Sequence, residues 1–244
     1  MPSGPLGGLL DPDPAVRQAI EDGLIFESET SEGGEIGVKA QFADSTFSLN
    51  TVFFYYVFDN LQVQNFNVAI FNFDTFNASE LTTKGIDMDW AWQTPVDGLV
   101  LSGAVSYTDT KYTDTFIPTA EDLQGRAAAR APKWSGNIAF DWFTPVGNAL
   151  EFGFSGNLAF SSAYFANDDT FDDDFRNSGY VTLDLSVSLG DPSGRWKVSV
   201  IGTNLTDEIW VNTSGAAPFR GTGDDLVLTQ NRGRQIFLEA AFRY

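Results

Sequence analysis

The chain has 244 residues, a formal net charge of −19, and neither cysteine nor histidine. These absences exclude a disulfide framework, a thiolate nucleophile, a Ser-His-Asp triad and the commonest transition-metal ligand. We therefore expect no catalysis and no cofactor, and the acidic balance argues against a nucleic-acid partner, which requires positive charge to neutralise phosphates.

The first 32 residues are rich in proline, glycine and acidic residues, and we predict a loop with a short helix-like piece at 15–22. They lack a basic segment followed by an apolar core, so the sequence predicts no signal peptide. No apolar run approaches the roughly 20 residues of a membrane-spanning helix. The longest such run covers residues 52–58.

From residue 35 onward, apolar and polar residues alternate in about nine segments, which is typical of strands with one apolar face. The clearest alternation is at 181–189. The predicted strands are 35–42, 47–58, 86–93, 99–108, 133–142, 150–161, 181–189, 196–203 and 233–244. Between the second and third strands, residues 59–81 are rich in Asn and Phe and show no clean period, so the sequence leaves open whether they extend the strands.

The connections between these strands alternate in length. Short turns are predicted at 43–45, 94–98, 144–148 and 190–194, and long connections at 59–81, 109–130, around 168–174 and at 205–229. In an antiparallel meander alternate connections lie at the same end, so every short turn is predicted at one end. Outer-membrane barrels have this asymmetry, whereas a soluble β-sandwich more often mixes the two ends.

The apolar face would be either the core side of a soluble sheet or a lipid-facing band. The second interpretation is favoured because the opposite face carries Asp, Asn, Ser and Thr, as the wall of a wet lumen does. Tryptophans also gather near strand ends, as in an aromatic girdle. They are Trp90, Trp92, Trp134, Trp142 and Trp196. We predict an all-β fold: an antiparallel up-and-down meander of about nine strands, part of a transmembrane β-barrel.

Several short segments follow one another in a characteristic order. Residues 35–39 read Glu-Ile-Gly-Val-Lys, and the aromatic strand after them closes with Asp-Asn-Leu-Gln-Val at 59–63. Further segments are Asn77-Ala78, Lys84-Gly85-Ile86-Asp87, residues 99–112, Ala131-Pro132, Asn204-Leu-Thr-Asp207 and Gly233-Arg234. Together they resemble the C-terminal half of a TonB-dependent outer-membrane receptor. Asp87 stands where that family more often has Glu, and Trp210 where Tyr is commoner.

The resemblance implies a 22-stranded barrel, filled by an N-terminal plug and energised through a TonB-box peptide. Such receptors import ferric siderophores, cobalamin, haem or oligosaccharides. No segment here resembles the plug or the TonB box, and an odd number of strands would put the chain's two ends on opposite sides of the membrane. We therefore expect a loop-like segment at 1–32 and the C-terminal part of a receptor barrel at 33–244, in a fragment of a longer protein.

The same resemblance implies a location in the outer membrane of a Gram-negative type of cell. The implied partners are outer-membrane lipid, the barrel-assembly machinery, TonB through a region absent from this sequence, and a small-molecule ligand. The residues that contact that ligand stay unknown, because in this family they lie on loop tips and on the plug.

One acidic cluster would suit a hard cation such as calcium. It consists of Asp168, Asp169, Asp172, Asp173 and Asp174. The segment lacks the glycine and the ligand spacing of an EF-hand loop. A solvated loop is therefore the favoured interpretation.

Arginines near the C-terminus have two interpretations as well. Arg220, Arg232 and Arg234 would face an anionic ligand such as a ferric siderophore, or Arg232 and Arg234 would pair with lumen carboxylates such as Asp184 or Glu239. The sequence favours structural pairing.

The last strand carries a predicted assembly signal. Its alternating apolar residues, ending on an aromatic, resemble the signal that the barrel-assembly machinery reads. They are Ile236, Leu238, Phe242 and Tyr244. A plain lipid-facing strand has the same pattern, and the two interpretations are compatible.

Two other functions agree with the composition. A soluble acidic β-sandwich with long loops would serve as a binding or adhesion module. A smaller channel that closes by oligomerisation would explain an odd strand count, but not the family-like segments.

Overall fold

The computed structural model describes residue 14 and residues 27–67, 72–115, 124–166, 176–216 and 226–243. The helix-like piece expected at 15–22 lies outside these residues. Nine strands form the main sheet. They are β1 (Thr30–Phe42), β2 (Phe47–Asn67), β3 (Asn72–Gln93), β4 (Leu99–Thr115), β5 (Trp134–Val146), β6 (Leu150–Ser161), β9 (Tyr180–Gly190), β10 (Trp196–Thr203) and β13 (Gln235–Phe242).

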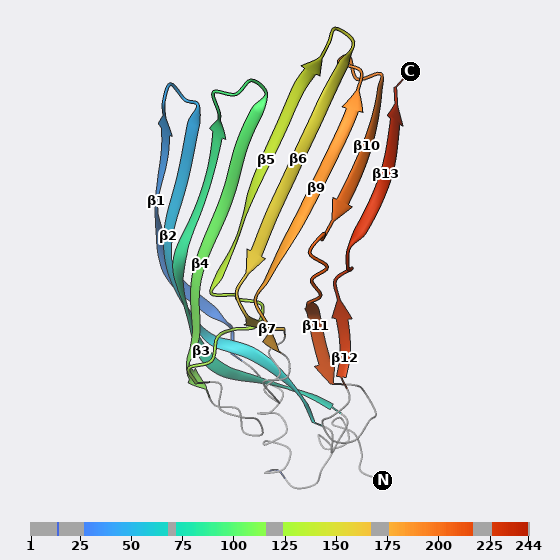
Figure 1. Cartoon of the computed structure of the whole chain (residues 1–244). Coiled ribbons are helices and arrows are strands. Elements are labelled where there is room, and N and C mark those ends of the chain that lie inside the picture. Colours follow the sequence, from blue (N-terminus) through green and yellow to red (C-terminus); the bar gives the residue numbers. More distant parts are fainter. Residues whose placement is uncertain are drawn as a thin grey trace.

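The main sheet follows chain order as a meander, β1-β2-β3-β4-β5-β6-β9-β10-β13, which confirms the predicted nine-stranded arrangement. All neighbours pair antiparallel. The short turns lie at one end, together with the C-terminal end of β13 (Figure 1). At the opposite end are two small hairpins, β7 (Tyr164–Phe165) with β8 (Arg176–Asn177), and β11 (Val211–Ala216) with β12 (Leu226–Gln230).

The register gives the sheet one apolar and one polar face, because directly opposed residues point to the same side. On β10, Val200 lies opposite Val187 of β9 and Leu238 of β13. The next residue, Ser199, lies opposite Ser188 and Glu239. Apolar and polar rows therefore alternate across the sheet, as the sequence predicted.

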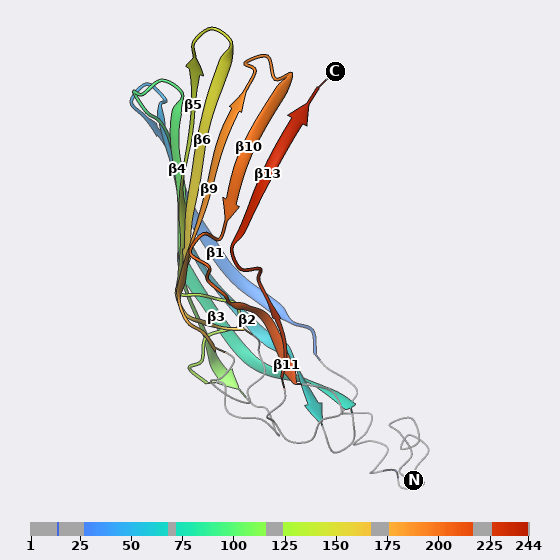
Figure 2. The ribbon, with the colours of Figure 1, turned by 45° about the vertical axis from the view of Figure 1, so that its right-hand side comes forward.

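The sheet has no packed core of its own. Among the described residues, the only buried hydrophobic side chains are Tyr112 and Ala166, whereas Ile36 is 72% and Leu238 77% exposed. A β-sandwich needs a second sheet against the apolar face, and the described strands form a single curved layer (Figure 2). The soluble β-sandwich interpretation is therefore wrong. No helix within the described ranges has the length and apolar character needed to cross a membrane.

The strands β2 and β3 are much longer than the alternation predicted. They have 21 and 22 residues, or about 70 Å at roughly 3.3 Å per residue. The predicted second strand ended at residue 58 because the pairing of β2 with β3 shifts between Phe58 and Leu61, where Asn60 has φ 58°. The pairing of β3 with β4 shifts in the same way between Glu80 and Leu81. Such bulges break the period and bend the strand, and the lower parts of β2 and β3 sweep away from the upper sheet (Figure 2).

Other bounds differ in smaller ways. β1 begins at Thr30, opposite Asp59 of the lengthened β2, rather than at residue 35. The turn predicted at 144–148 is shorter, because β5 continues to Val146 and Pro145 lies opposite Glu151. Pairing of β5 with β4 ends at Trp142, so Pro145 borders only one strand, where a missing N–H is tolerated. The loop expected at 205–229 contains most of the β11–β12 hairpin.

Two turn glycines offer a matched test of backbone strain. Gly98 and Gly147 both have positive φ, 75° and 63°. A Cβ on Gly98 would lie 1.8 Å from the carbonyl oxygen of Phe143, whereas a Cβ on Gly147 would meet nothing within 4 Å. We predict that Gly147→Ala costs about 1 kcal/mol through positive φ alone, and that Gly98→Ala costs at least about 2 kcal/mol more, since backbone must move. The measurement is the temperature at which each purified variant unfolds. Equal shifts for the two variants would contradict the argument.

Candidate functional site on the polar face

The polar face of the sheet is held by hydrogen bonds between side chains of neighbouring strands. These pairs are Asn50 with Asp89 (2.7 Å), Ser106 with Asp87 (2.5 Å) and Asn137 with Asn157 (2.8 Å). The first two pairs are exposed to solvent and the third is partly buried. The face therefore has the chemistry of a wet wall rather than of a protein core.

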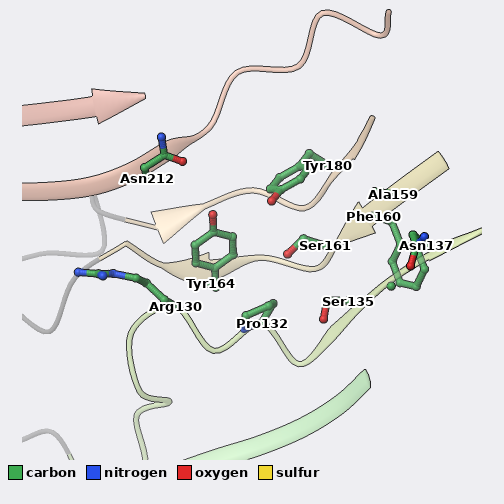
Figure 3. A pocket seen from close by; sticks show the side chains of 11 residues that line it. Arg130, Pro132, Ser135, Asn137, Ala159, Phe160, Ser161, Tyr164, Tyr180 and Asn212 are labelled. Atoms are coloured by element: carbon green, nitrogen blue, oxygen red, sulfur yellow. The ribbon is translucent and has the colours of Figure 1, made fainter. Parts of the chain in front are cut away.

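A hollow of about 550 Å³ opens at the end of this face where the long connections lie. It lies between the ends of β5 and β6, the start of β9 and the hairpins beyond them (Figure 3). The polar side chains that line it are Arg130, Ser135, Asn137, Ser161, Tyr164, Tyr180 and Asn212. Apart from one guanidinium these are neutral groups that donate and accept hydrogen bonds. Such a lining suits an oxygen-rich ligand.

Two tyrosines face one another across the hollow. The hydroxyl groups of Tyr164 and Tyr180 point toward each other (Figure 3). Burial, together with the charge and hydrogen bond of Tyr180, raises the pKa of Tyr164 to about 12. Tyr164 is therefore a neutral phenol at physiological pH. The ring of Tyr180 stacks on Trp210, with centroids 4.4 Å apart and planes at 8°, which holds it in place.

Arg130 marks the rim of the hollow. It adopts positive φ, 54°, its N–H donates to the carbonyl of Phe165 at 2.8 Å, and its Nε donates to the carbonyl of Ala166 at 3.3 Å. The Phe165 ring has the guanidinium of Arg126 4.1 Å from its centroid. The segment before β5 is thus tied to the end of β7, and the Arg130 side chain lies at one edge of the hollow (Figure 3).

A buried asparagine, Asn204, holds together the connection that follows β10. Asn204 is 8% exposed and has φ 48°. Its N–H donates to Asp184 Oδ1 at 2.7 Å, while its Oδ1 accepts from the N–H of Glu208 at 3.0 Å. Its Nδ2 donates to the carbonyls of Glu208 and Arg232, at 2.8 and 3.1 Å. The Asn204 side chain thus joins the start of this connection to the residues just before β13. The Asn204–Asp207 segment therefore has a structural role.

Two further asparagines replace backbone pairing where the strands stop. Asn177 accepts from the N–H of Val211 at 2.9 Å and donates to its carbonyl at 2.8 Å. Asn231 Oδ1 accepts from the N–H of Trp210 at 2.9 Å. Together these bonds fix the β8 and β11 segments around Trp210, and so fix the position of Tyr180. Sequence reasoning placed this region in loop and missed it; the isolated Asn residues were the available signal.

The arginine pairing predicted for Arg234 is confirmed, but its partner is different. Arg234 Nη2 lies 3.5 Å from Asp207 Oδ2, and its backbone N–H donates to Asp207 Oδ1 at 2.8 Å. Asp184, one of the expected partners, is used by the N–H of Asn204. Glu239 lies further along β13, opposite Ser199. Asp207 was not predicted because it lies 27 residues before Arg234 in the chain. The hydrogen bonds of Asn204 bring the two segments together.

Most of the other predicted site residues lie outside the described part of the chain. Ile236, Leu238 and Phe242 are 69, 77 and 66% exposed along one face of β13, and their role as an assembly signal stays a prediction. Tyr244, Arg220 and the calcium candidates Asp168, Asp169, Asp172, Asp173 and Asp174 lie outside the described residues. Within the described ranges, no group of three or more His, Cys, Asp or Glu residues could hold a metal ion.

A family model, "TonB dependent receptor-like, beta-barrel", matches residues 13–205. The chain belongs to this family. The match covers most of the sheet described above, and its C-terminal limit falls just after the Asn204 turn begins. A search of curated proteins found no match.

Solved structures share the receptor fold. The ferric yersiniabactin uptake receptor FyuA from Yersinia pestis is 17% identical with a TM-score of 0.69, covering 88% of this chain and 30% of FyuA. The siderophore receptor PiuA from Acinetobacter baumannii is 18% identical with a TM-score of 0.63, covering 88% of this chain and 28% of PiuA. The copper transporter OprC is 12% identical with a TM-score of 0.63, covering 88% and 31%. This receptor chain therefore spans about a third of the length of such structures.

The Asn204 turn can be tested by truncation. We predict that Asn204→Ala lowers the stability of the folded receptor by about 2–3 kcal/mol, because it removes the side-chain hydrogen bonds to the N–H and carbonyl of Glu208 and to the carbonyl of Arg232. Asn148→Ala, in an exposed turn, is the control and should change stability by less than about 0.5 kcal/mol. Thermal loss of the compact form on gels measures both. A shift no larger for Asn204→Ala than for the control would refute this role.

The Tyr164 phenol predicts an alkaline transition. Its pKa is raised from 10.0 to about 12, so the folded receptor holds this proton more tightly than the unfolded chain. The resulting contribution to stability is complete below pH 10 and is lost as the pH rises toward 12. Melting temperatures measured across this window should fall less steeply for Tyr164→Phe than for the parent receptor. Parallel curves would show that the phenol is not protected.

Proposed function

We propose that this chain is the C-terminal barrel portion of a TonB-dependent outer-membrane receptor that imports a ferric siderophore. The supporting observation is the polar-face hollow, which combines neutral donors, two tyrosines and Arg130 at the long-connection end of a lipid-facing sheet. Ferric siderophores present oxygen atoms and often negative charge, which such groups bind. FyuA and PiuA, both similar in fold, are named for siderophore uptake.

The open edges of the sheet support a longer protein. Within the described residues β1 pairs only with β2, and β13 only with β10. In a bilayer each edge would expose unpaired N–H and C=O groups, which lipid does not satisfy. The proposal therefore includes further strands, a plug and a TonB-binding region outside these 244 residues. Cobalamin, haem and oligosaccharides are the other cargo classes to compare.

No catalytic step belongs to the proposed function. The ligand would bind at the hollow from outside the cell, and TonB would supply energy through the plug. The side chains of this chain would only hold and orient the ligand.

We also propose that the barrel-assembly machinery reads four residues of the last strand: Ile236, Leu238, Phe242 and Tyr244. In that case Phe242→Ser should lower the amount of folded receptor in outer membranes. An unchanged amount would oppose that role.

The first test is the size and location of the native protein. An antibody against β10 and β13 should detect, in outer-membrane fractions, a band about three times the length of this chain, as the 30% coverage of FyuA implies. The unboiled band should migrate faster, as folded barrels do. A band of the chain's own size in the soluble fraction would overturn the proposal.

The hollow itself is tested by Arg130→Gln. We predict about tenfold weaker uptake of a labelled ferric siderophore, because a charged hydrogen bond is worth about 1.5–3 kcal/mol. Arg195→Gln is the matched control, since Arg195 pairs with Asp191 in the turn at the opposite end of the sheet. Equal uptake by the two variants would exclude Arg130 from the ligand site.

The cargo class has a separate test. Uptake of haem or cobalamin in place of every ferric siderophore would overturn the proposed cargo class.

A further inference from the structure

Three of the chain's five lysines converge on one carboxylate. The Nζ atoms of Lys84, Lys111 and Lys133 lie 3.9, 3.9 and 3.7 Å from the carboxylate oxygens of Asp109. The three lysine side chains are 61, 55 and 57% exposed, whereas that of Asp109 is 15% exposed. We call these four residues the lysine cluster. Its three cations exceed its one anion, on a chain whose net charge is −19.

The lysine cluster lies on the apolar face of the sheet. Lys84 is directly opposite Tyr55 of β2 and Asp109 of β4. Two residues further along β3, Ile86 is opposite Tyr107. Residues two apart on a strand share a face, so the cluster continues the apolar rows and points away from the polar-face hollow.

Measured along β3, the cluster lies about one membrane thickness from the short turns. Lys84 precedes by nine residues the end of β3 at Gln93, beside a short turn, and a tilted strand crosses a bilayer in about 9–11 residues. The rings of Tyr107 and Trp134 lie 4.7 Å apart just inside this level, as interfacial aromatic residues do. Lys133 Nζ lies 5.7 Å from the Tyr107 ring centroid.

An apolar hollow of about 330 Å³ lies next to the cluster, on the side of the short turns. Its lining consists of Ile86, Met88, Val105, Tyr107 and Trp134. All five lie on the face that the cluster shares. The outer wall thus places a cationic group beside an apolar recess.

We propose that this part of the wall binds a phosphorylated lipid of the outer leaflet, with its phosphate at the lysine cluster and an acyl chain in the apolar hollow. Three ammonium groups carry more donors than the two oxygens of Asp109 accept, and a phosphate supplies both acceptors and charge. A lipid is also held at this height by its acyl chain, which a free phosphate lacks. The inference rests on the proposed outer-membrane location.

The test uses the native receptor, purified in detergent, with Trp134 as the reporter. Brominated phosphatidic acid should quench fluorescence far more strongly than brominated phosphatidylcholine with the same chains. A triple Lys84→Gln, Lys111→Gln, Lys133→Gln variant should weaken phosphatidic acid binding at least about tenfold, since each lysine near an anionic lipid contributes. A double Lys39→Gln, Lys197→Gln variant removes lysines of the polar face and should bind like the parent.

Asp109→Asn separates binding from structure. Loss of the anion should tighten phosphatidic acid binding, even if the variant melts at a lower temperature. Unchanged binding by the triple variant, or equal quenching by both lipids, would overturn the inference. Competition by inorganic phosphate at equal concentration would mean an anion site without a lipid.

The outcomes distinguish this inference from the proposed function. A receptor in the outer membrane that imports its cargo but binds lipid without the lysines refutes only the lipid site. A lipid-binding receptor that imports no ferric siderophore refutes only the cargo. Recovery of the protein from the soluble fraction refutes both.

Discussion

The antiparallel backbone ladder is the constraint on which the other features depend. Its register places Val187, Val200 and Leu238 in one row and Ser188, Ser199 and Glu239 in the next. A slip of one residue would exchange the two faces, putting carboxylates among the apolar rows and leucines among the polar rows. Because the described sheet is a single layer with almost no buried hydrophobic residue, no second layer corrects such an error. The register alone separates the apolar face from the polar face.

Where the ladder ends, asparagine side chains take over its function. An amide has a donor and an acceptor side by side, so Asn177 imitates a neighbouring strand toward Val211. Asn204 and Asn231 do the same for the connection after β10. The polar-face hollow is built on these bonds, because Tyr180 keeps its position only while Trp210 is held. Irregular backbone is thereby made rigid enough to carry a site.

Charge is distributed according to the surroundings of each surface. The polar face carries carboxylates that are paired with amides and hydroxyls, as with Asp89 and Asn50. The opposite face is mostly apolar, and three lysines gather on it around Asp109. The net charge of −19 describes neither surface. Local clustering, and not the total, determines which partner each surface meets.

The sequence by itself determined the sheet, its nine strands, its two faces and the end at which the short turns lie. These follow from period-two alternation and turn residues, which are local, and the strands at 150–161 and 196–203 agree with the structure to the residue. The same alternation failed at Asn60 and near Glu80, because a bulge changes the phase without ending the strand. Tertiary structure alone decided that Asp207 pairs with Arg234, that Tyr164 meets Tyr180, and that Lys84 and Lys133 reach Asp109. Each of these contacts joins side chains far apart in the chain, and their proximity depends on register and loop return, which no local pattern encodes.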